Sequence, residues 1–220
     1  MRRWLWRGLF GLLVLLALLL AYPAILRPPT TPYILSEGVR LGSIKRSWVS
    51  MEEIAPAMAR SVVAAEDANY CLHWGFDMGA IRTALEEGAG RGASTISQQT
   101  VKNVYLWQGR SWPRKALEAL LTPVVELIWP KRRILEIYLN MAEFDEGVFG
   151  VEAASQHYFG VGAVDLSAAQ AARLAAVLPN PKGRSASKPS DAVAGRARAI
   201  QDGAATIRAD GRAACFEGKS

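Results

Sequence analysis

The stretch from residue 8 to residue 26, GLFGLLVLLALLLAYPAIL, contains no charged side chain. As a helix, these nineteen residues would extend about 28 Å at roughly 1.5 Å per residue, close to the ~30 Å hydrocarbon thickness of a bilayer. Trp4, Trp6 and Tyr22 lie at its two ends, where aromatic rings favour the headgroup region. We therefore expect residues 8–26 to form a transmembrane anchor.

Three arginines precede the apolar stretch. The positive-inside rule predicts that residues 1–7 stay in the cytoplasm and that everything after Arg27 lies outside it. The alternative is a cleaved signal peptide, whose apolar core typically spans 7–15 residues and ends at a small-x-small cleavage site. Ala21 and Ala24 flank a Tyr-Pro pair, which matches that site poorly. We therefore favour an uncleaved single-pass anchor.

Composition narrows the classes of protein that remain. The net charge of the 220-residue chain is +6, and removing the three arginines before the anchor leaves +3, which argues against a nucleic-acid binder. Charged residues make up 21% and no low-complexity tract occurs, which excludes a mainly disordered chain. Two cysteines and two histidines cannot form a disulfide framework or a His-rich metal cage. Cys71 and Cys215 would lie in an oxidising space, and their spacing does not reveal whether they pair.

Organisation after the anchor is simple. Residues 27–50 are rich in Pro, Gly and Thr, and they are interpreted as a juxtamembrane connector to a domain over 51–220. Within that domain the apolar residues recur at helical spacing, and no alternating strand pattern competes with them. A Gly-containing break at 86–94 leads to a helix for which Ser94 is the expected N-cap, and Ser111 is expected to cap the next. The predicted fold class is all-α, or mainly α.

A first pair of candidate residues is Glu66 and Asp67, at the end of an apolar helical pattern. Burial there would raise the pKa of a carboxyl group, as a general base requires. Adjacent acids at a helix C-terminus also oppose the macrodipole, so local helix stability does not explain them. The alternative is an ordinary solvated helix end.

A second candidate is Glu118, four residues after Arg114 and three after Lys115, so that all three can share one side of a helix. The alternative is a surface ion pair of about 0.3–0.5 kcal/mol. However, both cations fall in the first turn after Ser111, the helix end that repels positive charge. A bound phosphate would resolve this conflict, and Lys102 could add a third cation.

An amide-rich helix completes the set, with Gln98, Gln99 and Asn103 close in sequence; such amides usually form just a polar helix face. Two carboxylates, three cations, these amides and a membrane anchor suit sugar chemistry on a lipid-linked, phosphate-bearing substrate. A carboxylate can deprotonate an attacking hydroxyl while cations stabilise a departing diphosphate.

Five blocks, in order, resemble the peptidoglycan glycosyltransferase family, and among its members the monofunctional biosynthetic transglycosylases. The blocks are EDANYCLHWGFD (66–77), GASTISQQTVKN (92–103), RKALE (114–118), KRRILEIYLN (131–140) and GVFGVEAASQHYFG (147–160). They cover most of residues 55–180, and Tyr70 departs from the family's usual Phe. About forty residues follow Asn180, so we expect no transpeptidase domain.

The resemblance implies a role for each matched residue. Glu66 resembles the general base that deprotonates the 4-hydroxyl of the acceptor, lipid II. That oxygen attacks the anomeric carbon of the nascent lipid-diphosphate-linked glycan, forming a β-1,4 linkage with inversion and releasing undecaprenyl diphosphate. Glu118 resembles the second catalytic Glu on the diphosphate side. The residues that match substrate-binding positions are Asp67, which would support Glu66, and Ser94, Gln98, Gln99, Lys102, Asn103, Arg114 and Lys115.

The resemblance also implies a lysozyme-like helical fold with a hydrophobic subdomain that dips into the bilayer. The stretch Val104–Trp107 with Trp112 is either membrane-facing or core, and the block at 131–140 is interpreted as scaffold. We expect a bacterial inner-membrane enzyme with its catalytic domain in the periplasm, with other cell-wall synthesis proteins as further partners. A divalent cation, Mg²⁺ or Mn²⁺, can accompany the substrate diphosphate in the family, although no dedicated ligand cluster stands out.

Three other functions were weighed. A glycan-cleaving enzyme of the same architecture would have no use for three cations around one glutamate. A non-enzymatic scaffold is expected to lack Glu66 or Glu118, and both are present. A nucleic-acid binder conflicts with the weak positive charge and the anchor. The sequence therefore favours the glycan polymerase.

Overall fold

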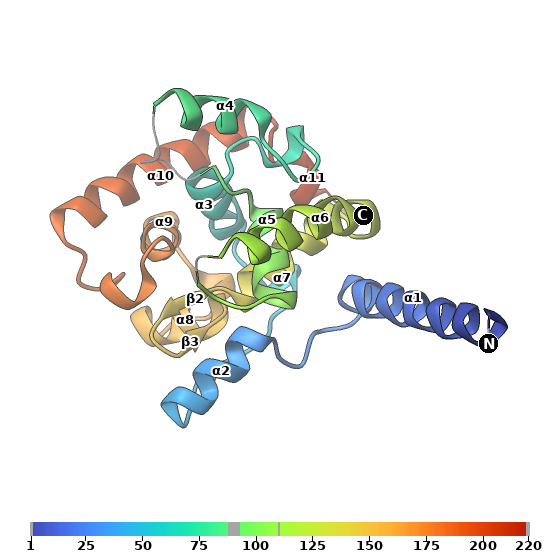
Figure 1. Ribbon diagram of the computed structural model, residues 1–220. Helices are drawn as coiled ribbons and strands as arrows, with labels where there is room; N and C mark the ends of the chain where they lie inside the picture. The colour runs from blue at the N-terminus through green and yellow to red at the C-terminus, as the bar shows by residue number, and fades with distance from the viewer. Residues whose placement is uncertain (1, 88–92, 110, 219–220) are drawn as a thin grey trace.

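In the computed structural model, which describes residues 2–87, 93–109 and 111–218, most of the chain is helical (Figure 1). The helices are α1 (Arg2–Ile25), α2 (Pro32–Leu41), α3 (Pro56–Glu66), α4 (Met78–Glu86), α5 (Ile96–Tyr105), α6 (Trp112–Ile128), α7 (Lys131–Met141), α8 (Val151–Phe159), α9 (Ala168–Val177), α10 (Asp191–Ala209) and α11 (Ala214–Glu217). Short 3₁₀ turns are η1 (Met51–Glu53), η2 (Tyr70–Leu72), η3 (Ala163–Asp165) and η4 (Pro181–Gly183). This confirms the mainly α-helical class. Most of the glycine-containing break expected at 86–94 lies outside the described residues.

The core forms where two groups of helices meet. Helix α3 packs against α9 and α10, and α5 packs against α6 and α7 (Figure 1). Helix α7 is the most deeply embedded, since Ile134, Leu135 and Leu139 are all fully buried. Glu66 ends α3 on the side that faces α5, so the packing of these two groups brings residues from α3, α5 and α10 together.

Three short strands, which the sequence pattern did not predict, form a small sheet. β3 (Val148–Phe149) pairs with β1 (Lys45–Arg46) in parallel and with β2 (Glu143–Asp145) in antiparallel orientation. Strands of two or three residues are too short to display an alternation of apolar and polar positions. Gly150, with φ of 84°, follows β3, and a Cβ there would lie 2.9 Å from the carbonyl oxygen of Asn140, so only glycine fits.

The ends of two helices test the expected N-caps. Ser111 caps α6, as expected, because its side chain accepts a hydrogen bond from the N–H of Arg114. The expected Ser94 cap is wrong by one residue, since Thr95 caps α5 and forms a reciprocal capping box with Gln98. The sequence Thr-Ile-Ser-Gln-Gln places Gln98 three residues after Thr95, which is the spacing that this box requires.

Helix α2 lies within the segment 27–50 that was interpreted as a connector. The Thr31 side chain caps it, Pro32 occupies its first turn, and Gly42 ends it with φ of 75°. These are ordinary helix start and stop signals. The high Pro and Gly content of the segment obscured them, because those residues delimit the helix rather than interrupt it.

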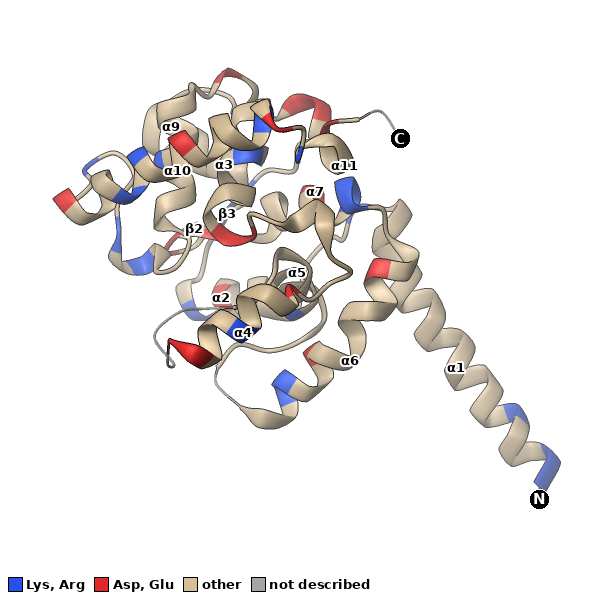
Figure 2. Ribbon diagram, turned by 90° about the horizontal axis from the view of Figure 1, so that it is seen from above, with Lys and Arg blue, Asp and Glu red and all other residues tan. Residues whose placement is uncertain are grey.

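Helix α1 is long and apolar enough to cross a membrane, and almost none of it is buried against the rest of the protein. It projects away from the other helices, with its arginines at the free end (Figures 1 and 2). The C-terminal end of α1 is attached to the rest of the protein by hydrogen bonds that its backbone carbonyls accept. Pro23 has no N–H for the Leu19 carbonyl, so this turn of the helix needs outside donors.

Side chains on and beside α5, α6 and α7 supply donors to this end of the helix, and the Tyr105 hydroxyl lies 3.5 Å from the Leu19 carbonyl oxygen. The Trp129 indole donates to the Leu20 carbonyl at 2.9 Å, and the Tyr105 hydroxyl lies 3.1 Å from the same oxygen. The Arg133 guanidinium donates to the carbonyls of Pro23 at 2.8 Å and Leu26 at 2.7 Å. In a low-dielectric setting these carbonyls would be costly to leave unpaired. The C-terminal end of α1 is therefore docked on the rest of the protein rather than loosely tethered to it.

Trp129→Phe tests this docking. The substitution keeps an aromatic ring and removes the N–H that reaches the Leu20 carbonyl, so we expect a loss of about 1 kcal/mol and a melting temperature about 2–4 °C lower in detergent. Trp112→Phe is the matched control, because Trp112 is 89% exposed and should leave the melting temperature unchanged. Equal melting temperatures for the two variants would contradict the docking.

Candidate active site

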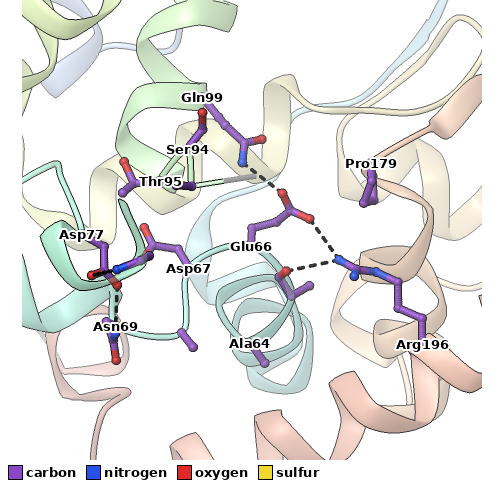
Figure 3. Close-up of a pocket in the computed structure, with 14 residues that line it drawn as sticks. Ala64, Glu66, Asp67, Asn69, Asp77, Ser94, Thr95, Gln99, Pro179 and Arg196 are labelled. Carbon is purple, nitrogen blue, oxygen red and sulfur yellow. Dashed lines mark hydrogen bonds and ion pairs between the residues drawn. The ribbon is translucent and has the colours of Figure 1, made fainter. Parts of the chain in front are cut away.

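A cavity of about 770 Å³ opens where α3, α5 and α10 meet (Figure 3). Its walls come from the end of α3, the loop that follows, the start of α4, the N-terminus of α5, the loop after α9 and the side of α10. The lining residues are Ala64, Ala65, Glu66, Asp67, Ala68, Asn69, Asp77, Ala80, Ala93, Ser94, Thr95, Gln99, Pro179 and Arg196. Of the ten sequence-predicted site residues, four line this cavity and six do not: Gln98, Lys102, Asn103, Arg114, Lys115 and Glu118.

Glu66 is the last residue of α3, and its carboxylate lies between Gln99 and Arg196 (Figure 3). The Gln99 amide donates to Oε2 at 3.0 Å, and an Arg196 guanidinium nitrogen lies 3.7 Å from Oε1. Oε1 is buried and has no hydrogen-bond partner among the described residues. One carboxylate oxygen of Glu66 thus accepts a hydrogen bond, and the other, which is called its open oxygen below, accepts none from the residues that the structure describes. The second oxygen can accept a proton from a substrate hydroxyl.

Burial is the main influence on the Glu66 carboxyl, and it raises the pKa. The Gln99 hydrogen bond and the positive charges of Arg196 and Lys102 oppose that rise, and the negative charge of Asp67 adds to it. The net direction is upward, which makes the ionised group a stronger base than an exposed carboxylate. The alternative of a solvated helix end is therefore wrong for Glu66.

Asp67 is buried too, but its carboxylate is already engaged. Oδ2 accepts the N–H of Ile96, the first residue of α5, at 3.0 Å, and Oδ1 lies 2.7 Å from Nε2 of His73. A carboxylate at a helix N-terminus is favoured by the macrodipole. Asp67 thus ties the end of α3 to the start of α5, which holds Glu66 and Gln99 in register.

The three amides of α5 have different surroundings. Gln99 contacts Glu66, whereas Gln98 is buried and its side chain closes the Thr95 capping box. The Asn103 side-chain oxygen accepts from Gln108 at 3.2 Å, away from Glu66. Ser94 lines the cavity and accepts from Lys115 at 3.2 Å, so it links the cavity to the cations of α6.

The second predicted carboxylate, Glu118, is buried with both oxygens engaged. Arg114 donates to one oxygen and Lys115 to the other, and the Arg114 Nε also donates to the Gly109 carbonyl at 3.0 Å. Its side chain is 3% exposed, so the alternative of a surface ion pair is wrong. The position of these cations near the N-terminus of α6 is visible in Figure 2.

Lys102 adds positive charge to this cluster. Burial is the largest influence and lowers its pKa, Arg114 and Lys115 lower it further, and the charges of Glu118 and Glu66 oppose the change. Within the described parts of the chain, no hydrogen bond or ion pair engages the Lys102 ammonium. Three cations therefore face one carboxylate, and this surplus of positive charge favours an anion with two or more negative charges.

Sequence reasoning missed two residues beside Glu66. Arg196 lies on α10, 130 positions from Glu66, and reaches it only because α10 packs on α3; its guanidinium also donates to the Ala65 carbonyl. His73 lies within the first motif block, and its partner Asp67 lies six residues earlier. Because Asp67 and His73 are close in sequence, their spacing could have suggested this pair. No local spacing could have suggested Arg196.

The described residues contain no group of three or more His, Cys, Asp or Glu side chains arranged to hold a metal ion. Asp67 is committed to His73 and the α5 backbone, and Glu118 is committed to Arg114 and Lys115. The donor set of this site therefore does not fit a resident divalent cation.

Comparison with known proteins identifies the family of this chain. A family model described as Transglycosylase matches residues 36–205. The chain is 66% identical over 216 residues to the biosynthetic peptidoglycan transglycosylase of Jannaschia sp. (strain CCS1), covering 98% of this chain and 90% of the relative. Proteins of the same name from Ectopseudomonas mendocina (strain ymp) and Caulobacter vibrioides (strain ATCC 19089 / CIP 103742 / CB 15) are 50% and 44% identical, covering 88% and 93% of this chain and 84% and 94% of the relatives.

Proposed function

The chain belongs to the transglycosylase family and is a peptidoglycan glycosyltransferase, and from this premise we propose that it polymerises glycan strands from lipid II. The growing lipid-diphosphate-linked chain is transferred to the 4-hydroxyl of lipid II, with inversion to a β-1,4 linkage and release of undecaprenyl diphosphate. The observation that carries the proposal is the open, buried oxygen of Glu66 in a cavity that Ser94 and Lys115 connect to a cationic cluster.

In this mechanism Glu66 Oε1 accepts the proton of the acceptor 4-hydroxyl as its oxygen attacks the anomeric carbon. The bond from that carbon to the diphosphate oxygen breaks, and the diphosphate leaves with the electron pair. Lys102, Arg114 and Lys115 stabilise the charge that develops on it, and Glu118 holds the last two in position. Asp67 positions the base through the α5 backbone.

The surplus of cations also distinguishes a glycan polymerase from a glycan-cleaving enzyme. A cleaving enzyme needs a general acid at a glycosidic oxygen, and surplus cations near that acid would stabilise its ionised form instead of its protonated form. A departing diphosphate does need that positive charge. The cation surplus around Glu118 therefore favours transfer over hydrolysis.

We place the enzyme in the bacterial inner membrane, with residues 1–7 cytoplasmic, residues 8–26 spanning the bilayer and the catalytic domain in the periplasm. Residues 27–50, in which α2 lies and the family match begins, would join the anchor to the domain over 51–220. The stretch Val104–Trp107, for which both a membrane-facing and a core position were considered, contains residues of both kinds. Val104 and Leu106 are core residues, whereas Trp107 is half-exposed.

A second contact with the bilayer would come from the exposed apolar side of α6. Trp112, Leu120 and Leu127 on α6 are 89%, 70% and 71% exposed. Exposed apolar side chains of this size are characteristic of membrane or protein contacts. Their position on the helix that carries Arg114 and Lys115 would bring the cationic cluster close to a lipid-linked diphosphate.

The proposal is tested with detergent-solubilised protein and labelled lipid II. We expect a ladder of polymer that lysozyme digests. Shortening of preformed glycan would instead identify a cleaving enzyme, and retained binding of lipid II without any polymer would identify a scaffold.

Lys102→Met tests the cation cluster. Methionine keeps the length of the side chain and removes the charge, so kcat/KM for lipid II should fall about ten- to a hundredfold. Folding should be retained, because burial already disfavours the charged ammonium. Arg208→Met, at an exposed position of α10, is the charge-matched control and should match the wild type. A Lys102 variant with unchanged kcat/KM would remove this residue from the diphosphate site.

A further inference from the structure

Tyr138 is a buried residue of α7 whose hydroxyl reaches the side chain that supports Glu66. The hydroxyl donates to Gln99 Oε1 at 3.2 Å, and Gln99 Nε2 donates to Glu66 Oε2 at 3.0 Å. Tyr138 is 2% exposed, among the apolar core positions of its helix. The block at 131–140 was interpreted as scaffold, and this hydroxyl is the part of the block that instead faces the candidate active site.

The geometry points to Tyr138 as a positioning residue that orients the Gln99 amide toward the Glu66 carboxylate, an inference that rests on the proposed function. An amide side chain has one donor end and one acceptor end, and the two can exchange by rotation. The donor end supports an ionised carboxylate, whereas the acceptor end would repel it. A hydroxyl that donates to Oε1 keeps the amide N–H group on the Glu66 side.

The surroundings of Tyr138 keep its hydroxyl a donor. Burial, and then the negative charge of Glu66, raise the pKa of Tyr138 well above its usual value, so the phenol stays protonated at any pH at which the enzyme works. Removal of the hydroxyl would leave Gln99 Oε1 without this donor in a buried setting. The amide could then rotate toward another donor, and Glu66 would lose the one hydrogen bond that it makes within the described parts of the chain.

The hydrogen bonds from Tyr138 to Gln99 and from Gln99 to Glu66 matter for the reaction because they fix the orientation of the Glu66 carboxylate. With Oε2 fixed by Gln99, the carboxylate cannot rotate freely, and Oε1 is left without a hydrogen-bond partner among the described residues, so that it can accept the proton of the acceptor hydroxyl. The charged groups around Glu66 are Asp67 after α3, Lys102 on α5 and Arg196 on α10. A substitution at Tyr138 changes none of these charges, so any shift in the titration of Glu66 would report the hydrogen-bond chain.

Tyr138→Phe is the test, with lipid II polymerisation measured across pH. We expect kcat about tenfold lower, KM within twofold of the wild type, and the acidic limb of the kcat/KM profile moved to higher pH, because the ionised base has lost support. Tyr158→Phe is the matched control. The Tyr158 hydroxyl also donates at 3.2 Å, to the Phe144 carbonyl on another side of the core, and its removal should leave the pH profile in place.

A second comparison separates positioning from a general loss of stability. In a Gln99→Ala background, Tyr138→Phe should cause no further fall in kcat, because the amide through which it acts is absent. Additive falls in kcat, or a Tyr138→Phe profile that matches Tyr158→Phe, would overturn the inference and leave the proposed function standing. A wild type that makes no polymer would contradict the proposed function itself. That outcome is distinct from a failure of the Tyr138 inference, in which the wild type still makes polymer.

Discussion

Glu66→Gln is expected to lower kcat about 10²–10⁴-fold, the contribution that a positioned general base typically makes. The amide has nearly the volume of the carboxyl and cannot take the proton of the acceptor hydroxyl at neutral pH. Lipid II binding should be retained, because the cations that we propose hold the diphosphate are unchanged. The measurement is the single-turnover rate with saturating lipid II, and a rate within threefold of the wild type would remove Glu66 as the base.

The same variant has an expected effect on stability that shows its fold is intact. The unfolded carboxyl titrates near its usual pKa of 4.5, and burial raises the folded-state pKa above that value. The folded protein therefore binds more protons over this interval, and the ionised carboxylate costs stability at neutral pH. That cost is relieved as the pH falls through the folded-state pKa.

Glu66→Gln should accordingly melt at a higher temperature than the wild type at pH 7, and the difference should vanish below about pH 4. Thermal melts of both proteins at several pH values measure this directly. A variant that is less stable than the wild type at pH 7 would show that the carboxylate is stabilised by its surroundings, against the direction argued here.

Loss of the disulfide between Cys71 and Cys215 is expected to lower the free energy of unfolding by about 2–5 kcal/mol. The two cysteines are 144 positions apart, so the cross-link strongly restricts the unfolded chain. It joins η2, which follows Glu66 in the chain, to α11 near the C-terminus. Phe216 next to Cys215 is fully buried and lies against Tyr70.

The double variant Cys71→Ser/Cys215→Ser is compared with the wild type by urea denaturation in detergent. We expect a lower midpoint for the variant, and a reductant should shift the wild type toward it while leaving the variant unchanged. A wild-type midpoint that neither the substitutions nor the reductant alter would contradict a stabilising role for the cross-link.

The parts of the site that depend on local spacing could be predicted from the sequence. Arg114, Lys115 and Glu118 share a helix face because residues three and four apart are neighbours there, and the structure has them in contact. Glu66 became a candidate in the same way, from an acid at the end of an apolar helical pattern, whereas its role as general base was implied by the family resemblance. In each case one element supplies all the residues that the argument needs.

The parts that depend on packing between elements could not be predicted. Tyr138 reaches Gln99 because α7 lies against α5, and Arg196 reaches Glu66 because α10 lies against α3. The pairing of the two cysteines likewise depends on where α11 ends in space. Helical periodicity gives the buried face of each helix but not the helix that covers it.

The roles proposed for this site all depend on one arrangement, in which Glu66 Oε1 receives the acceptor hydroxyl while the α5 and α6 cations hold the departing diphosphate. A crystal structure with unreactive donor and acceptor analogues bound measures this most directly. We expect the acceptor 4-hydroxyl within about 3.2 Å of Glu66 Oε1 and the donor diphosphate on Lys102, Arg114 or Lys115. A diphosphate bound away from all three cations, or an acceptor hydroxyl out of reach of Glu66, would contradict it.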